Sequence, residues 1–344
     1  MLTSCPTRTL GPNGPAVSAI GLGTRGLSGF YGSIDKDEVF EMLTYAADRR
    51  VTFWDTSEFY PGSESIIGDW CTKTGRRSDI FLATKFGLTQ LDNHERRLCS
   101  KPDYIKEALQ KSLKALQTDY IDLYYQSRVD PSVPIEIVLE TLRPFVDNGV
   151  IKYLGLSECS VATLRRAKAV PGVGDKVVAV QMEYSPFELG IERNGFLEVA
   201  RELGVTVVAH SPLARGIITG RYQSLDDFEV DDARRHYPRF SPENFPKNVK
   251  LVEVFQRLAE KYGATPSQVA LAWILAQHPD LVSIPGTKAV SRLEENLRSV
   301  DISLSHEDMG AIRKLAEQAD DVIHGSRALV IPEEDCIELG DWKS

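Results

Sequence analysis

Three ionisable side chains stand close to the ends of two apolar segments, at positions that suit proton transfer. Asp55 and Tyr60 belong to the segment FWDTSEFY, and Lys85 ends the segment FLATK. If both segments are neighbouring parallel strands, their carboxyl ends meet at the same edge, and the three side chains lie together there. A cation beside a phenol stabilises the phenolate, which makes Tyr60 a better proton donor at neutral pH. A structural ion pair beside a packed tyrosine is the alternative, and the spacing alone leaves both open.

A glycine motif lies near the N-terminus. The segment GLGTRG, Gly21 to Gly26, matches the G-x-G-x-x-G pattern of dinucleotide-binding Rossmann units. In such a unit the glycine loop leads directly into a helix whose N-terminus meets the pyrophosphate. Here LSGFYGSI follows Gly26, and the first helix signal is the D-x-x-E capping box that begins at Asp35. We therefore interpret the motif as a chance match in the first loop of another fold.

Apolar segments alternate with helix-period segments along the chain. The predicted strands cover 18–23, 51–56, 79–85, 119–125, 151–157, 177–182, 205–210 and 281–286. Near-continuous apolar strands of this kind are typical of a parallel sheet that is buried on both faces. Amphipathic segments lie between them, for example at about 134–148, 160–170, 193–203, 247–262 and 291–299. Eight strands in alternation with about as many helices predict an α/β fold, the (β/α)8 TIM barrel.

The domain organisation follows from the same pattern. No domain boundary is visible, so we interpret residues 1–344 as a single domain. It comprises an N-terminal hairpin over 1–17, the barrel over 18–300 and a C-terminal extension over 301–344. Long irregular segments lie at about 86–102, at about 212–246 and after about 318, and such segments are commonly functional lids or disordered tails. The first two follow predicted strands, at the face where barrel enzymes hold their active sites.

Composition limits the partners and the compartment. Hydrophobic residues make up 42% and charged residues 26%, a balance typical of soluble globular proteins. No apolar segment approaches the ~20 residues of a membrane helix, and the first residues lack the apolar core of a signal peptide. The formal charge of −9 argues against nucleic acid as a partner. Five scattered cysteines without C-x-x-C spacing indicate a reducing, cytoplasmic location and neither a disulfide framework nor a metal site.

Beyond these patterns, the sequence resembles the aldo-keto reductase superfamily over about residues 8–300, most closely a bacterial and fungal branch. The matching segments, in family order, are GLGT (21–24), DTSEFY with GSE (55–64), LATKFG (82–87), DYIDLYYQ with RVDP (119–131), IKYLGLSE (151–158), AVQMEYSPF (179–187), AHSPLARG (209–216) and IPGTKAVSRLEEN (284–296). Members of the superfamily reduce aldehydes and ketones with NADPH on a (β/α)8 barrel. The resemblance therefore implies an NADPH-dependent reductase that acts on a small-molecule carbonyl substrate.

The family's catalytic residues are Asp, Tyr, Lys and His. The resemblance implies that Tyr60 gives a proton to the carbonyl oxygen, and that Lys85 and Asp55 tune it. Ser127 stands at the position of the family's His, and a serine hydroxyl is shorter and takes up no proton near neutral pH.

Three interpretations of Ser127 are open. It is an engineered change that traps a complex, a natural change that widens the pocket, or a mark of drift toward cofactor binding or a non-redox reaction such as isomerisation or dehydration. The last corresponds to a second function class, since some relatives are NADPH-binding regulatory subunits of ion channels. Retention of Asp55, Tyr60 and Lys85 favours an enzyme.

The resemblance also implies a cofactor site built from several loops. Ser157 and Gln181 match the residues that hold the nicotinamide carboxamide, but Glu158 replaces a frequent Asn and donates no hydrogen bond unless protonated. His210 matches the ring that stacks on the nicotinamide; a histidine packed in the barrel is the alternative. The other implied cofactor positions are Gly23, Thr24, Ser211, Leu213, Gly216, Gly286, Thr287, Lys288, Arg292, Glu295 and Asn296.

Within that set, Arg292 is the expected contact of the 2′-phosphate, because a guanidinium forks onto phosphate oxygens. Glu295 and Asn296 are expected to hold the adenine, although a charged surface helix is the alternative. The charged segment 220–245 is expected to fold over the pyrophosphate, unless it is a solvated, mobile loop. The substrate pocket is expected to be lined by Arg25, Phe30, Tyr31, Phe59 and Arg128, which suit an aromatic ligand with polar edges.

Overall fold

The structure, a computed structural model, describes residues 5–90, 96–327 and 335–343 of the chain. Its main sheet consists of β3 (Leu22–Gly23), β4 (Phe53–Asp55), β5 (Phe81–Phe86), β8 (Ile121–Gln126), β9 (Ile151–Ser157), β10 (Val177–Glu183), β11 (Thr206–His210) and β12 (Val282–Ser283). The strands are hydrogen-bonded in the order β12-β11-β10-β9-β8-β5-β4-β3, and each of these pairs is parallel.

The segments at the two ends of this order also pair with each other, which closes the sheet. Parallel bridges join Ile20 to Ser283 and Gly23 to Gly286. A Cβ atom on Gly23 would lie 2.8 Å from the carbonyl oxygen of Ile284, so only glycine allows this close approach. Gly23, the second glycine of the GLGTRG motif, is therefore needed where the barrel closes.

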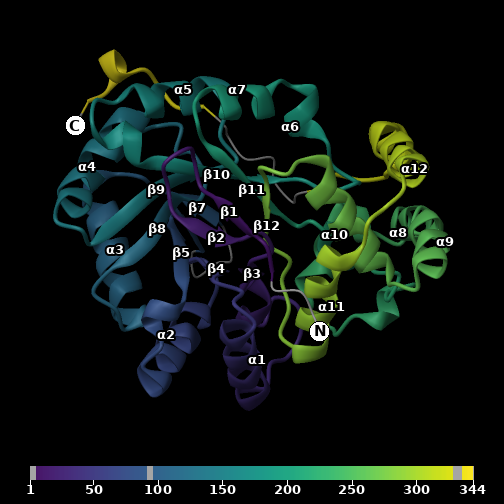
Figure 1. The fold of residues 1–344 in the computed structure, drawn as a ribbon. Coiled ribbons are helices and arrows are strands. Elements are labelled where there is room, and N and C mark those ends of the chain that lie inside the picture. Colours follow the sequence, from purple (N-terminus) through teal and green to yellow (C-terminus); the bar gives the residue numbers. More distant parts are fainter. Residues whose placement is uncertain (1–4, 91–95, 328–334, 344) are drawn as a thin grey trace.

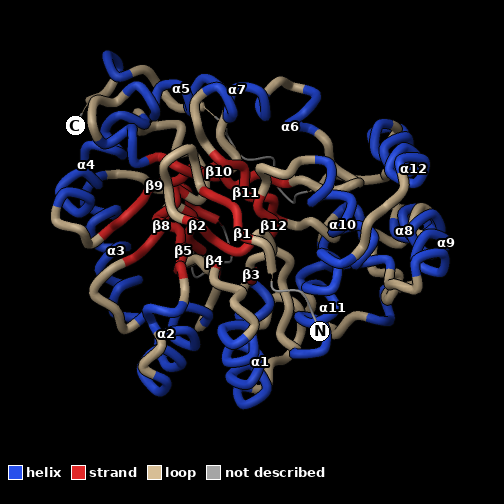
Figure 2. Tube along the Cα trace, in the orientation of Figure 1, coloured by secondary structure: helices blue, strands red, loops and turns tan. Residues whose placement is uncertain are grey.

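The helices are α1 (Lys36–Asp48), α2 (Ser63–Thr74), α3 (Pro102–Leu116), α4 (Ile135–Asp147), α5 (Val161–Ala169), α6 (Gly190–Arg193), α7 (Phe196–Glu202), α8 (Phe245–Lys250), α9 (Glu253–Tyr262), α10 (Pro266–Gln277), α11 (Val290–Leu297), α12 (His306–Glu317) and α13 (Ala319–Val322). They surround the strands, which gather in the centre of the molecule (Figures 1 and 2). This arrangement confirms the predicted (β/α)8 TIM barrel.

Local signals explain how some helices begin and why one escaped prediction. The carboxylate of Asp35 caps α1 by accepting hydrogen bonds from two backbone N–H groups, and no α-helix lies between the glycine motif and this cap. Thr265 and Gln268 form a capping box at the start of α10. Residues 267–274 of α10 are buried, and a helix buried all round has no amphipathic period to detect.

A hairpin of β1 (Thr7–Thr9) and β2 (Ala16–Ser18) lies across the barrel end where the strands begin (Figure 1). Its side chains Leu10 and Val17 are fully buried. They join an apolar cluster inside the barrel that includes Phe53, Ala83, Leu123, Val208 and Val282. The hairpin therefore seals the barrel at this end with an apolar layer.

The alternation of side chains along the strands determines which residues lie in the next layer inside the barrel, toward its carboxyl end. Asp55, Lys85 and His210 each stand two residues beyond a member of the inner cluster on the same strand. Because strand side chains alternate with a period of two, these residues point into the barrel at its carboxyl end. The interior of the barrel therefore changes from apolar to polar over two residues along these strands.

Several segments differ from the predictions. The stretch at about 86–102 contains an antiparallel hairpin, β6 (Leu88–Gln90) and β7 (Arg96–Leu98), of which residues 91–95 lie outside the described residues. The helix predicted over 247–262 is two helices, α8 and α9. Asn248 in α8 donates side-chain hydrogen bonds to the carbonyl oxygens of Arg239 and His324, contacts that no local pattern reveals.

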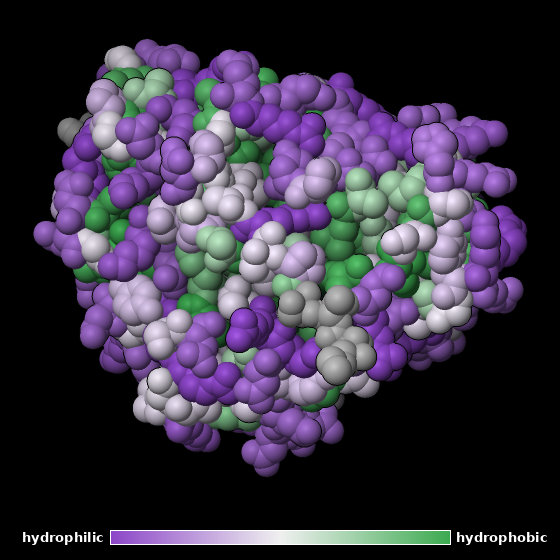
Figure 3. Space-filling model, in the orientation of Figure 1, coloured by the Kyte–Doolittle hydropathy of each residue, from purple (hydrophilic) through white to green (hydrophobic). Residues whose placement is uncertain are grey.

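The surface is mostly hydrophilic on the face that carries the hairpin, and hydrophobic atoms show there in separate groups (Figure 3). In the described part of the chain, no helix is both long enough and apolar enough to cross a bilayer. The five cysteines are free thiols, and four of them are buried.

Candidate active site

Asp55, Lys85 and Gln181 form a buried polar group at the carboxyl end of the barrel. The Nζ atom of Lys85 lies 2.5 Å from Oδ1 of Asp55 and also donates to the carbonyl oxygen of Thr56 over 2.7 Å. The side-chain amide of Gln181 donates to Oδ2 of Asp55 over 2.7 Å. Asp55 and Lys85 are each only 2% exposed. The ion pair is therefore held rigidly by strands β4, β5 and β10.

Tyr60 lies in the turn between β4 and α2. Its backbone N–H donates to the carbonyl oxygen of Ser57, and its own carbonyl accepts from Ser63, each over 3.0 Å. The Nζ atom of Lys85 lies 5.4 Å from the centre of the Tyr60 ring, and Cζ of Arg25 lies 5.9 Å from it. The phenol is thus flanked by two cations.

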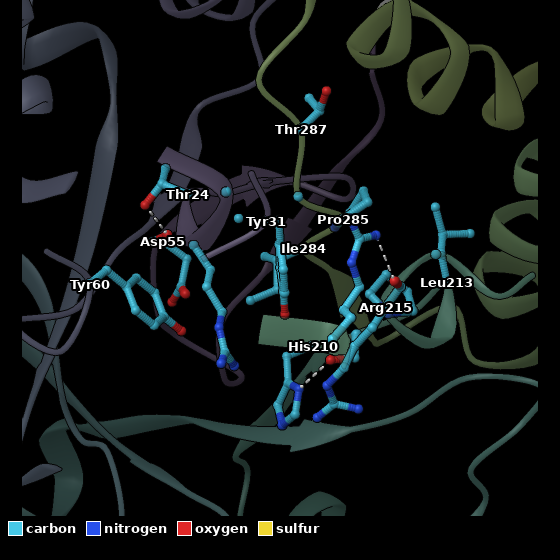
Figure 4. A pocket seen from close by; sticks show the side chains of 18 of the residues that line it. Thr24, Tyr31, Asp55, Tyr60, His210, Leu213, Arg215, Ile284, Pro285 and Thr287 are labelled. Atoms are coloured by element: carbon cyan, nitrogen blue, oxygen red, sulfur yellow. Dashed lines mark hydrogen bonds between the residues drawn. The ribbon is translucent and has the colours of Figure 1, made fainter. Parts of the chain in front are cut away.

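One cavity of about 1040 Å³ joins this group to the loops at the opposite side of the barrel mouth. Figure 4 shows Asp55 and Tyr60 on one side, Leu213, Arg215 and Pro285 on the other, and His210 and Ile284 between them. The cavity is lined by all the residues predicted to be catalytic or to bind the cofactor, and by Arg25, Tyr31, Phe59 and Arg128 of the predicted substrate set.

Phe30 is the exception. It is absent from the cavity lining, and its ring stacks on that of Phe59 with 5.6 Å between the ring centres. Its carbonyl oxygen accepts a hydrogen bond from Ala233. Phe30 packs against the lining residue Phe59 and supports the segment 220–245 through its carbonyl oxygen, and its role as a substrate contact stays a prediction.

Ser127 directly follows β8 and is 6% exposed. Its N–H donates to the carbonyl oxygen of Phe86 over 2.7 Å, which continues the strand pairing by one residue. The Nη1 atom of Arg128 donates to the carbonyl oxygen of Ser127 over 2.6 Å and to Oγ of Ser157 over 3.2 Å. Ser157 and Ser127 are thus connected by one guanidinium.

Glu158 has a different environment from the one its sequence position suggested. It adopts a positive φ of 52°, its Oε1 lies 2.7 Å from Nε2 of His210, and its Oε2 accepts from Arg327 over 2.5 Å. Although burial opposes ionisation, the hydrogen bond from His210 and the nearby arginines hold the pKa of Glu158 well below its usual value. Burial in turn lowers the pKa of His210.

Glu183 at the end of β10 belongs to the same network. It accepts hydrogen bonds from Arg215 over 3.0 and 3.1 Å and from Arg327 over 3.1 Å. Burial alone would raise its pKa, but the charge of Arg215, with His210 and Arg327, lowers the pKa to about 2. Arg327 therefore connects the C-terminal extension to two ionised carboxylates under the barrel mouth.

The segment 220–245 folds into short 3-10 helices, Leu225–Asp227, Ala233–His236 and Pro238–Phe240. Arg215, which precedes this segment, lines the cavity, and so do Tyr222, Arg234 and Tyr237 within it. Sequence reasoning named none of these four residues. The signal that could have found them is the interleaving of arginines with aromatic residues, because such pairs stack: Cζ of Arg234 lies 4.5 Å from the ring centre of Tyr222.

The far end of the cavity holds the residues expected at the adenosine. Lys288 donates from Nζ to the carbonyl oxygens of Tyr31 and Ser33. Glu295 accepts a hydrogen bond from Thr265 over 2.6 Å, and Asn296 is 4% exposed. Arg292 lies beside them on α11 and lines the same cavity.

Comparison with known proteins agrees with this arrangement. The Aldo/keto reductase family profile matches residues 19–317. The chain is 49% identical over 323 residues to the aldo-keto reductase str7 of Strobilurus tenacellus, covering 92% of this chain and 93% of that protein. It is 46% identical over 322 residues to yakc of Schizosaccharomyces pombe, an aldo-keto reductase whose name includes NADP(+), with the same two coverages.

Among solved structures, a thermostable aldo-keto reductase, Tm1743, in complex with the inhibitor epalrestat is similar with a TM-score of 0.71 and 31% identity. The match covers 90% of this chain and 99% of that one. Fold, site and sequence thus agree: the chain belongs to the aldo/keto reductase family and is an oxidoreductase of that family.

Proposed function

We propose that this chain reduces an aldehyde or ketone to an alcohol with NADPH, and that Tyr60 gives the proton. The observation that carries the proposal is the buried Asp55–Lys85 pair, whose ammonium group lies 5.4 Å from the Tyr60 ring inside the cavity. The choice of NADPH as the cofactor is supported by the relative yakc, whose name includes NADP(+).

The residues present fit NADPH. The cavity reaches the upper end of the ~300–1,000 Å³ range of small-molecule sites, which suits a ligand as long as a dinucleotide. Ser157 and Gln181 offer polar groups beside Tyr60 for a carboxamide. Ala214, Arg215 and Gly216 all have positive φ values, a backbone arrangement that favours anions. Arg292 lines the same cavity and is available for a 2′-phosphate.

When bound, NADPH supplies the hydride that adds to the carbonyl carbon. Tyr60 donates its hydroxyl proton to the carbonyl oxygen, so that oxygen becomes the alcohol hydroxyl and the phenolate remains. The Lys85 ammonium stabilises the phenolate, and Asp55 keeps that ammonium in place. The phenolate then regains a proton from solvent, which balances the reaction. Ser127, beside the same end of the cavity, offers one hydroxyl to orient the carbonyl.

We also propose a cellular location and a type of partner. The free cysteines support a cytoplasmic location. The net charge of −9 supports a small molecule, rather than nucleic acid, as the partner.

Oxidation of NADPH tests the proposal when measured with a panel of aldehydes, quinones and polycyclic ketones. We expect at least one carbonyl to accelerate oxidation in the natural chain, and the alcohol product to accumulate in equal amount. If NADPH binds but no carbonyl accelerates its oxidation, in either the natural chain or the Ser127→His variant, the reductase proposal fails. A cofactor-binding regulatory role would then be the better account.

A further inference from the structure

Two arginines that line the cavity, Arg25 and Arg128, form no salt bridge with a carboxylate of the described residues. The same cavity holds Tyr60 and Lys85. Arg25 donates to the hydroxyl of Tyr237 over 3.0 Å, and its Nε atom is buried without a hydrogen-bond partner. Arg128 donates hydrogen bonds to the neutral oxygens of Ser127 and Ser157; the charge of Glu158 acts on it from nearby, but the two groups form no salt bridge.

The other buried cations of the cavity differ in this respect. Lys85 pairs with Asp55, Arg215 with Glu183 and Arg234 with Asp232. A buried guanidinium without a counter-charge is costly, so proteins rarely keep one without an anion that binds beside it. Arg25 and Arg128 are half-buried at this cavity, and their like charges act on each other. An anion that binds beside both would relieve this repulsion, which indicates that negative charge comes with a ligand.

The cofactor does not supply that charge. The nicotinamide end of NADPH is uncharged. Its phosphates are proposed to lie toward Arg215, which stands across the cavity from Tyr60 (Figure 4), and toward Arg292, which lines the same cavity. The anion must therefore belong to the second ligand, the molecule whose carbonyl group faces Tyr60.

Resting on the proposed function, we propose that the substrate carries a carboxylate within a few bonds of its reducible carbonyl, and that Arg25 and Arg128 bind this carboxylate. Cζ of Arg25 lies 5.2 Å from the ring centre of Phe30, 5.5 Å from that of Tyr31 and 5.9 Å from that of Tyr60. These rings hold the guanidinium beside the proton donor. A guanidinium binds a carboxylate through two parallel hydrogen bonds, so the pair orients the carbonyl as well as attracting the acid.

Apolar residues of the cavity are available to contact the part of the substrate that connects its carbonyl group to its carboxylate. Phe59 and the hairpin residues Leu88 and Leu98 line the cavity near this end. Ser127 occupies less space than a histidine would, which leaves room between Tyr60 and Arg128. An aromatic or short aliphatic oxo acid fits this combination of apolar wall and paired cations.

Matched substrates test the proposal, because esterification removes the charge and keeps the carbonyl. We would measure kcat/KM for 3- and 4-formylbenzoate and for their methyl esters in the natural chain. We expect at least one acid to exceed its ester by about tenfold or more, since a hydrogen-bonded ion pair contributes about this much or more to binding. In Arg25→Gln and Arg128→Gln, the acid-to-ester ratio should fall by about tenfold in each.

Arg257→Gln, which removes an exposed arginine of α9 outside the cavity, is the matched control and should leave the ratio unchanged. Thermal unfolding and NADPH affinity verify that the variants fold. If the esters are reduced but neither acid is preferred, or if both arginine variants keep the ratio of the natural chain, the carboxylate proposal is overturned while the reductase proposal stands. If NADPH binds and neither acid nor ester is reduced, the carboxylate proposal is overturned, and the wider carbonyl panel decides the reductase proposal.

Discussion

The Nε2 atom of His210 lies 2.7 Å from Oε1 of Glu158, while its Nδ1 atom lies 3.1 Å from the hydroxyl of Ser211. Glu158 is ionised, so Nε2 must carry the proton that it shares with this carboxylate. The imidazole is therefore fixed at both nitrogens, and its plane is set by protein contacts. Such a ring is prepared to stack on a flat ligand, which is the role that the resemblance implies for His210.

The first prediction concerns the arginine that completes this network. Arg327→Met should lower the free energy of unfolding by about 1–3 kcal/mol, because Glu158 and Glu183 each lose a charged hydrogen-bond donor. Urea unfolding of the single variant and of Arg327→Met combined with Glu158→Gln measures the effect. The double variant should recover part of the loss, since one buried charge is then absent. Strictly additive losses would contradict the coupling.

The second prediction concerns the proton donor. Tyr60→Phe should lower kcat for carbonyl reduction by at least about a hundredfold, as expected for loss of a general acid, and should leave NADPH affinity nearly unchanged. Tyr120→Phe, which removes a hydroxyl outside the cavity, is the control. A loss well below a hundredfold would assign the proton to another group.

The third prediction concerns Ser127. Ser127→His should raise kcat on a small aldehyde by at least about tenfold, because a donor aimed at the developing oxyanion is worth about 10²–10³-fold when well placed. If the pocket is shaped around serine for a bulky substrate, the imidazole will instead clash near Arg128 and Ser157. Turnover of bulky carbonyls would then fall. An unchanged kcat for both small and bulky carbonyls would remove this position from the mechanism.

The fourth prediction concerns cofactor choice. The chain should prefer NADPH to NADH, and Arg292→Ala should weaken NADPH binding about tenfold to a hundredfold through loss of a charge-assisted phosphate contact. NADH affinity should change little. Arg298→Ala serves as the control, since this arginine follows α11 but lies outside the cavity lining. Equal affinities for the two cofactors in the natural chain would refute the assignment.

The fifth prediction is a pH dependence of stability that originates at Glu58. Its Oε1 accepts from the N–H of Gly87 over 2.8 Å and from the hydroxyl of Tyr104 over 2.5 Å, but burial dominates and raises its pKa to about 7. The folded state therefore binds more protons than the unfolded state between about pH 4.5 and 7, so stability falls as the pH rises through this window.

The gap between the two pKa values corresponds to up to about 3 kcal/mol. Glu58→Gln keeps an acceptor for both donors and should remove this part of the decline between pH 5 and pH 8 in urea unfolding. Glu41→Gln, at an exposed position of α1, is the control. A decline of the same size in Glu58→Gln would exclude Glu58 as its origin.

Residues on strands were the predictable part of this molecule. Asp55 and Lys85 stand at the ends of apolar strands, and the period of two together with parallel pairing is enough to bring them together. The eight-strand pattern likewise predicts the barrel, because the strands and most of the helices between them have a period that is visible locally.

Contacts between segments far apart in the chain were not predictable. Arg327 contacts Glu158 and Glu183, which stand 169 and 144 positions earlier in the chain, and no periodicity links these positions. Phe30 is an aromatic residue of the kind that often lines a pocket. Its ring instead stacks on that of Phe59, which lines the cavity, whereas Phe30 is not among the lining residues. Likewise, no sequence pattern indicates that Arg25 and Arg128 form no salt bridge among the described residues, because this depends on where distant carboxylates lie.

Closure of the barrel by the bridges between Ile20 and Ser283 and between Gly23 and Gly286 also constrains how the protein is made. The ribosome releases β3 long before β12 exists, so the first strand waits with an unpaired edge while nearly all the remaining chain is synthesised. Such a distant pairing closes slowly, because its partners are separated by most of the sequence. Nascent chains that stop before residue 282 would expose the free edges of both β3 and β11, and these are the species most prone to aggregate during translation.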